Sequence, residues 1–137
     1  MSINDAYIFL IMIFLHIVDD YYLQGVLANM KQRSWWLKLP GYTNKYKNDY
    51  IAALICHGYS WSFMVHLPLA IKYFYFEPIL LKQIIILVFI VAQGLMHAYI
   101  DHQKANRFRI NLVHDQIMHF LQIWGSFLII IFIWPWF

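Results

Sequence analysis

Long apolar runs separated by short polar connections dominate the sequence. Four runs, at residues 4–27, 50–75, 78–101 and 112–134, are each long enough to cross a membrane, because a helix needs about 20 residues to span roughly 30 Å of hydrocarbon. The connections at 28–49 and 102–111 are polar. The pattern predicts an all-α fold in which one domain, residues 1–137, forms an integral membrane bundle of four transmembrane helices.

Polar residues interrupt each apolar run at one of its ends. They are His16, Asp20 and Gln24 at the end of the first run, His57 at the start of the second, His97 and Asp101 at the end of the third, and Asp115 and His119 at the start of the fourth. A chain that crosses four times brings these four ends back to the same depth. We therefore expect a polar His/Asp cluster in one layer at the cytoplasmic end of the bundle.

The spacing of these residues favours a metal site. His16 and Asp20, His97 and Asp101, and Asp115 and His119 are each four residues apart. On a helix such pairs share one face and lie about 6 Å apart, so both members can reach one ion. The predicted metal ligands are His16, Asp20, His57, His97, Asp101, Asp115 and His119.

The predicted ligand set contains four imidazoles and three carboxylates, which suit Zn²⁺, Mn²⁺ or Fe. We expect a divalent metal, one or two ions, with zinc favoured, and a shared carboxylate would give enough bonds for two. The pattern does not choose between one ion and two. Cys56 is the single cysteine, which excludes a CxxC metal site.

Composition and charge support a membrane location. The chain is 62% hydrophobic and 12% charged, and eight of its ten Lys and Arg residues fall in the connections at 28–49 and 102–111. The positive-inside rule then places these connections in the cytoplasm and both termini outside, in a bacterial inner membrane. Although the net charge is +3, the basic residues form no continuous stripe, so the expected partner is the lipid bilayer and not nucleic acid.

Helical geometry separates several nearby residues from the cluster. Asp19, His102 and His114 each neighbour a predicted ligand and should point about 100° away from it. Cys56 should likewise turn away from the His57 face and fill the core. His66 lies nine positions from His57, out of phase with it, and is predicted to pack in the outer half of the bundle.

The combined pattern resembles a known grouping. HxxxDxxxQ in the first run, a lone His opening the second, HxxxDxxK ending the third and DQxxH opening the fourth are similar to uncharacterised prokaryotic and phage membrane proteins grouped as domain of unknown function 3307. The matching positions include Lys31, Lys104 and Gln116. Tyr21 departs from the Phe common after the first Asp in that family. The resemblance implies a shared set of polar residues and supplies no reaction, because the family has no settled activity.

The function predicted first is a membrane-embedded metal-dependent hydrolase opening to the cytoplasm. Its substrate would be a phosphoester or acyl ester, either at a lipid headgroup or in a nucleotide-like anion, and the metal would activate water. Asp20, Asp101 and Asp115 would serve as ligands or as the general base, Gln24 and Gln116 would orient the substrate, and Lys31 and Lys104 would bind its anionic part.

Two other classes of function stay open. A di-iron oxygenase or desaturase also uses histidines at the cytoplasmic ends of spans, but typically more than four. A metal or proton transporter, or a small membrane protein that binds a host partner, would be non-enzymatic. A transporter needs polar residues in the outer halves of the spans, where the sequence offers little beyond His66 and Gln93.

Overall fold

The computed structural model describes residues 3–76 and 78–133, and over these residues the chain is helical. The elements in chain order are α1 (Ile3–Ile17), η1 (Val18–Leu23), α2 (Leu27–Met30), α3 (Arg33–Leu37), η2 (Asn44–Tyr46), α4 (Asp49–Ile71), η3 (Lys72–Phe76), α5 (Leu80–Ala105), α6 (Leu112–Leu128) and η4 (Ile129–Ile133). η1, η3 and η4 are π-helical, and η2 is a 3₁₀ turn.

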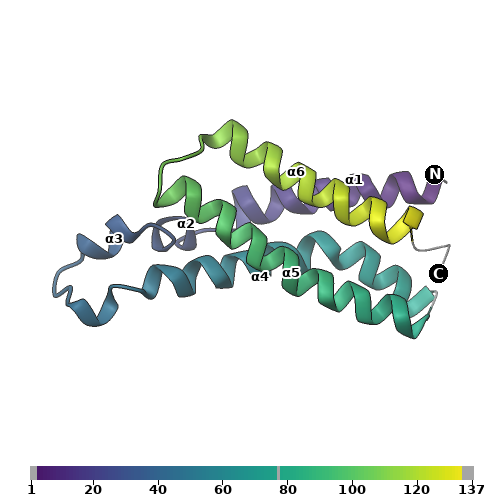
Figure 1. Cartoon of the computed structure of the whole chain (residues 1–137), viewed down its shortest axis with the longest axis horizontal. Helices are drawn as coiled ribbons and strands as arrows, with labels where there is room; N and C mark the ends of the chain where they lie inside the picture. Colours follow the sequence, from purple (N-terminus) through teal and green to yellow (C-terminus); the bar gives the residue numbers. More distant parts are fainter. Residues whose placement is uncertain (1–2, 77, 134–137) are drawn as a thin grey trace.

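The four long helices run up and down in an elongated bundle (Figure 1). One end of the bundle holds the beginning of α1, the end of α4, the beginning of α5 and the end of α6. α2, α3 and the connection between α5 and α6 lie at the other end. This is the antiparallel arrangement that the apolar pattern predicted, and it brings the polar ends of the four runs to one end of the molecule.

Two boundaries differ from the prediction. The first helix stops at Leu23 and not at residue 27, because Gly25 takes a left-handed conformation with φ +50°, which glycine adopts at helix ends without steric cost. The third helix continues past residue 101 to Ala105. The end predicted at Trp134 lies outside the described residues.

α4 is the central helix of the bundle. It contacts α1 and α5 closely, and buries apolar residues such as Trp61, Val65 and Leu69 together with the polar His57 and His66. The apolar core lies toward the end of the bundle that holds the start of α1. Its other members include Met12, Tyr73, Ile86, Ile123, Phe127 and Ile130.

The α4 and α5 backbones approach closely at Gly58 and Gly94. A Cβ placed on Gly58 would collide with the carbonyl oxygen of Gly94 and would lie 3.1 Å from the Cβ of Ala98. Only a residue without a side chain fits at this crossing. The contact is one residue from His57 and three from His97, so it sets how near the two imidazoles can come.

Two helical stretches of the described chain, Asn4–Leu23 and Leu80–Ala105, are long and apolar enough to cross a membrane by length and composition. α4 and α6 do not meet this criterion over the described residues. The helical fold is therefore confirmed over the described residues. That the four long helices cross a membrane stays a prediction, for which α1 with η1, and α5, have the required length and composition.

Candidate metal centre

Six of the seven predicted ligands converge at the end of the bundle where α2 lies. Nε2 of His97 is 3.1 Å from Nε2 of His57 and 3.7 Å from Oδ1 of Asp20. Two overlapping groups have ligand atoms within 4.8 Å of one another and could hold a metal ion. They are Asp20, His57 and His97 in one group, and His97, Asp101 and His119 in the other.

His57 shows why a cation fits here. Its Nδ1 lies 3.5 Å from Oδ2 of Asp19 without a hydrogen bond, and its Nε2 lies beside the Gln24 amide nitrogen, which only donates, so Nε2 presents a lone pair. That lone pair accepts a hydrogen bond from Nε2 of Gln24 at 2.9 Å, yet Oδ1 of Asp20 also lies 3.1 Å from it. A lone pair and a carboxylate oxygen repel at this distance unless a proton or a metal ion lies between them.

His119 faces a second such arrangement. Its Nδ1 donates to Oε1 of Gln122 at 3.2 Å, so its Nε2 also presents a lone pair. Nε2 lies 3.5 Å from Oδ1 of Asp101 and 3.5 Å from Oδ1 of Asp115. Neither this nitrogen nor Oδ1 of Asp115 makes a hydrogen bond within the described part of the chain.

Asp101 lies between the two histidines. Its Oδ1 faces His119, and its Oδ2 lies 3.6 Å from Nε2 of His57. Each oxygen of the carboxylate is thus directed to a different imidazole, as in a carboxylate that bridges two ions. The geometry is compatible with the two-ion site that the sequence left open.

The spacing of the converging atoms matches a metal centre. Donor atoms bound to a tetrahedral zinc ion at about 2.0–2.1 Å lie about 3.3 Å from one another. Close separations among the Nε2 and carboxylate oxygen atoms of the cluster include 3.1 Å, between His57 and Asp20, and 3.9 Å, between His97 and Asp101. Small shifts would bring these atoms onto one or two ions.

The buried charges do not balance without further positive charge. Four carboxylates, those of Asp19, Asp20, Asp101 and Asp115, have side chains no more than 8% exposed. Lys31 pairs with Asp101, and Lys104 pairs with Asp115. Two negative charges are left over, and buried charges are costly unless paired. One divalent cation, or protons on two imidazoles, would neutralise them.

His16 lies at the edge of the cluster, outside both groups. The indole N–H of Trp61 donates to its Nδ1 at 2.7 Å, and its Nε2 lies 3.1 Å from Oε1 of Gln116. Because the indole nitrogen only donates, Nδ1 accepts and Nε2 carries the proton. Both ring nitrogens of His16 are thus engaged, and this geometry does not support the predicted ligand role. Gln116 in turn donates to Asp20 and Asp115, both at 3.3 Å.

Asp19 joins the site although α-helical geometry predicted that it would point away. It is 1% exposed, accepts a hydrogen bond from the Ser60 hydroxyl at 2.7 Å and faces Nδ1 of His57. The reason is η1: π-helical i→i+5 bonding widens the turn, so neighbours are separated by less than the 100° of an α-helix. Asp19 and Asp20 therefore both face the bundle interior.

Asp19 is positioned to orient His57 as a ligand, since a carboxylate on the second ring nitrogen fixes the tautomer and raises the basicity of the first. We expect Asp19→Asn to lower metal affinity about 10- to 100-fold while the fold is retained. Competition with a chromophoric chelator would measure this. Asp49→Asn, at the beginning of α4 and away from the cluster, is the matched control. Equal affinity in the two variants would contradict the orienting role.

A cavity of about 250 Å³ lies beside the cluster. It is lined by Asp20, Tyr21, Gln24, Lys31, Asp101, Lys104, Leu112 and Gln116. All four residues predicted to bind substrate are therefore brought together, next to two of the three predicted catalytic carboxylates. The third, Asp115, does not line the cavity but pairs with Lys104 and accepts a hydrogen bond from Gln116, which both do.

Contacts from the connections hold Lys31 in this cavity. The Asn106 amide, at the end of α5, donates to the backbone oxygen of Lys31 at 2.9 Å and accepts from the backbone N–H of Arg33 at 2.7 Å. Lys31 is 5% exposed, which is rare for a lysine and consistent with its pairing to Asp101. No spacing rule could have identified Asn106, because it lies 75 residues from Lys31 in sequence.

Other neighbours of the cluster also escaped the sequence analysis. Trp61 stacks on His97 with ring centroids 4.2 Å apart, and His97 stacks on His119 at 4.0 Å. Trp61 lies one turn from His57, but sequence analysis normally assigns an apolar residue at that spacing to the hydrophobic core.

Cys56 was predicted to fill the core and is exposed instead, because it lies on a face of α4 that is turned outward. His66 is buried against Phe89, as its outer-half position predicted.

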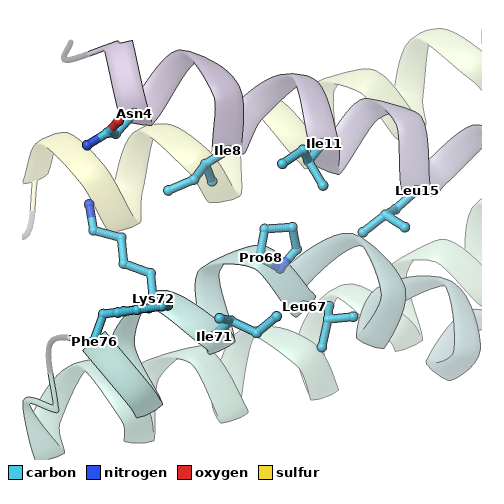
Figure 2. A pocket seen from close by; sticks show the side chains of 9 residues that line it. All are labelled: Asn4, Ile8, Ile11, Leu15, Leu67, Pro68, Ile71, Lys72 and Phe76. Carbon is cyan, nitrogen blue, oxygen red and sulfur yellow. The ribbon is translucent and has the colours of Figure 1, made fainter.

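The largest described cavity lies away from the cluster. About 560 Å³ in volume, it separates α1 from α4 and is lined mainly by apolar side chains, including Ile8, Ile11, Leu67 and Ile71 (Figure 2). Asn4 and Lys72 contribute polar groups at the end nearest the beginning of α1. Among the described residues its lining contains no histidine or carboxylate, in contrast to the cavity beside the cluster.

Comparisons of the chain with protein-family models, with curated proteins and with solved structures find no match. Function is therefore inferred from the site alone.

Proposed function

We propose that the protein is a membrane-embedded, metal-dependent hydrolase that acts on a phosphoester from the cytoplasmic side. One observation carries the proposal: Nε2 atoms of His57, His97 and His119 and oxygens of Asp20 and Asp101 converge beside a cavity that also holds lysine and glutamine side chains. A metal-capable cluster next to an anion-binding cavity favours hydrolysis of a charged ester.

The proposed membrane placement has all four long helices crossing. Two of them meet the length and composition of a span, and large apolar side chains are exposed on every long helix, for example Phe14, Phe63, Val88 and Leu121. The basic connections lie at the same end of the bundle as the metal cluster. The positive-inside rule then gives a site facing the cytoplasm.

The proposed ligands are His57, His97 and His119, with Asp20, Asp101 and Asp115 as further ligands and Asp101 as the bridge if two ions bind. Zinc suits this mixture of imidazole and carboxylate. A bound zinc ion would supply a water of pKa about 7 and would stabilise the negative charge that develops on the ester.

The cavity residues would bind the substrate. Lys31 and Lys104 pair with Asp101 and Asp115, and once a metal ion bound these carboxylates the two ammonium groups would offer the positive charge that a phosphate requires, while the amides of Gln24 and Gln116 would supply N–H donors. Asp20 is the carboxylate best placed to take the proton from the attacking water, because it lines the cavity while also contacting His57. The water oxygen would bond to phosphorus as the bond from phosphorus to the ester oxygen breaks, and Asp20 would pass the proton taken from water to the leaving alkoxide, so that the products are an alcohol and a phosphate.

Elemental analysis with an activity assay tests the proposal. The full chain, purified without chelators, is expected to contain one or two equivalents of zinc or manganese and to release alcohol from phosphoesters. Chelation should remove both metal and activity, and zinc should restore them. Metal removal should also lower the unfolding temperature, because an ion that binds only the folded state stabilises it.

Two results would count against this function. Bound iron with no hydrolysis would favour the oxygenase alternative. A chain that binds no added metal would leave the cluster as a network of carboxylates, lysines and protonated imidazoles, with a binding or structural role. The proposed grouping with the domain of unknown function 3307 proteins rests on the shared polar pattern and is independent of either result.

A further inference from the structure

An apolar groove on the outside of the bundle lies further along α6 than the polar cavity. It lies between α1 and α6, has a volume of about 380 Å³ and is lined by Phe9, Ile117, Phe120, Leu121 and Trp124. Ile117, Leu121 and Trp124 are each at least half exposed. The groove is therefore open along its side to whatever surrounds the bundle.

The groove and the polar cavity share one stripe of α6. Leu112 and Gln116 line the cavity, and Phe120 and Trp124 follow at intervals of four residues and line the groove. His16 joins the two, since its Nε2 lies 3.1 Å from Oε1 of Gln116 and its ring centroid lies 5.4 Å from that of Phe120. A molecule with a polar end and an apolar end could occupy both at once.

The length of the stripe matches one leaflet of a bilayer. From Leu112 to Trp124 the helix rises about 18 Å, at about 1.5 Å per residue. The hydrocarbon core of a bilayer is about 30 Å thick, so one leaflet contributes about 15 Å. A lipid chain lying along α6 would reach from the polar cavity to about the middle of the bilayer.

We infer that the substrate is an acyl-bearing phosphoester whose headgroup carries a net negative charge, with its phosphate in the polar cavity and one acyl chain in the groove between α1 and α6. This inference rests on the proposed function and specifies its substrate class. The two lysines select the anionic end, and the groove selects the chain. A soluble nucleotide-like anion would use the cavity and leave the groove without a role.

The cavity of about 560 Å³ between α1 and α4 does not fit this substrate. Its polar residues, Asn4 and Lys72, lie at the end nearest the beginning of α1 (Figure 2). The metal cluster includes Asp20, which lies on η1 beyond the other end of α1. A lipid whose phosphate met Lys72 would hold its ester bond at the opposite end of α1 from Asp20. The two grooves therefore make different predictions about where a lipid chain is found.

Photolabelling tests the inference in the zinc-loaded full chain. The probe is a phosphatidic acid with a diazirine near the end of one acyl chain, in phosphatidylcholine vesicles, and labelled peptides are mapped by mass spectrometry. Labelling is expected on residues 117–124 of α6. Ile117→Trp, which fills the groove, should reduce it at least fivefold, and Leu121→Trp should do the same one turn further on.

Met118→Trp is the matched control, because Met118 is exposed on α6 but lies outside the groove lining. It should leave the labelling unchanged. A phosphatidylcholine probe with the same diazirine measures general contact with lipid. Equal labelling by the two probes, labelling mainly at Leu67–Ile71, or no effect of Ile117→Trp and Leu121→Trp would each overturn the inference.

Activity measured on the same samples separates the two proposals. Groove-specific labelling without hydrolysis of any phosphoester would refute the hydrolase and leave the lipid site standing. Zinc-dependent hydrolysis of a soluble phosphoester without groove labelling would refute the lipid site and support the hydrolase. Hydrolysis of phosphatidic acid that falls at least tenfold in Ile117→Trp, with the soluble ester unaffected, would support both.

Discussion

Replacing His97 with alanine is expected to abolish metal binding and hydrolysis. His97 belongs to both metal-capable groups, and its Nε2 lies 3.1 Å from His57 and 3.9 Å from Asp101. Without it neither group retains three ligands. Activity should fall at least about 10³-fold, equivalent to about 4 kcal/mol of transition-state stabilisation. Metal content by elemental analysis and the rate of phosphoester hydrolysis are the two measurements.

The packing of His97 calls for a second variant. Its ring stacks on both Trp61 and His119, so alanine also leaves a space in a buried layer. His97→Gln fills more of that space and still removes the imidazole ligand, so it should lose metal while unfolding closer to the wild-type temperature. His114→Ala, at an exposed histidine near the beginning of α6, should change neither property. Full metal content in both His97 variants would exclude the shared site.

Replacing Gly58 with valine is expected to separate α4 from α5. The new Cβ would meet the carbonyl oxygen of Gly94, and a backbone atom cannot move aside as a flexible side chain can. Overpacking of this kind costs about 3 kcal/mol of unfolding free energy when the backbone must shift. Because Gly58 adjoins His57, the same displacement should also weaken metal binding. Thermal unfolding of the purified protein and its metal content would report both effects.

Gly125 provides the control for this prediction. A Cβ placed there meets nothing within 4 Å among the described residues. Gly125→Val should therefore keep the metal, and its stability should be unchanged or slightly higher, since glycine inside a helix costs about 1 kcal/mol relative to alanine. If Gly58→Val were as stable as Gly125→Val, the close approach of α4 and α5 would not be what positions His57 against His97.

The i,i+4 spacing was a dependable guide to the cluster. Nε2 of His119 lies 3.5 Å from Asp115, and Nε2 of His97 lies 3.9 Å from Asp101, as one shared helical face requires. The convergence of the four polar ends also followed from the alternation of apolar runs, because an antiparallel bundle returns the chain to the same end. Six of the seven predicted ligands are brought together for these reasons.

The same rule was wrong at Asp19, where it assumed 100° per residue in a segment that is π-helical. It also assigned His16 to the metal without knowledge of Trp61, whose indole N–H occupies one ring nitrogen. The first difference comes from local backbone geometry and the second from a contact between helices, and the periodicity of the sequence predicts neither. Trp61 is apolar in character and lies 45 residues from His16, so spacing alone does not link them.

The sequence by itself determined the helical class, the antiparallel order and the polar residues that gather at one end, because hydrophobic periodicity and short connections leave few other ways to bury the apolar surface. Only the tertiary structure decided which atoms face each other: Asp101 between His57 and His119, Asp19 behind His57, and Lys31 drawn into the cavity. Periodicity fixes the face of a helix on which a side chain lies. Which side chain it contacts on a neighbouring helix depends on how that helix is rotated and how closely it packs. Contacts such as that of Gly58 with Gly94 determine both.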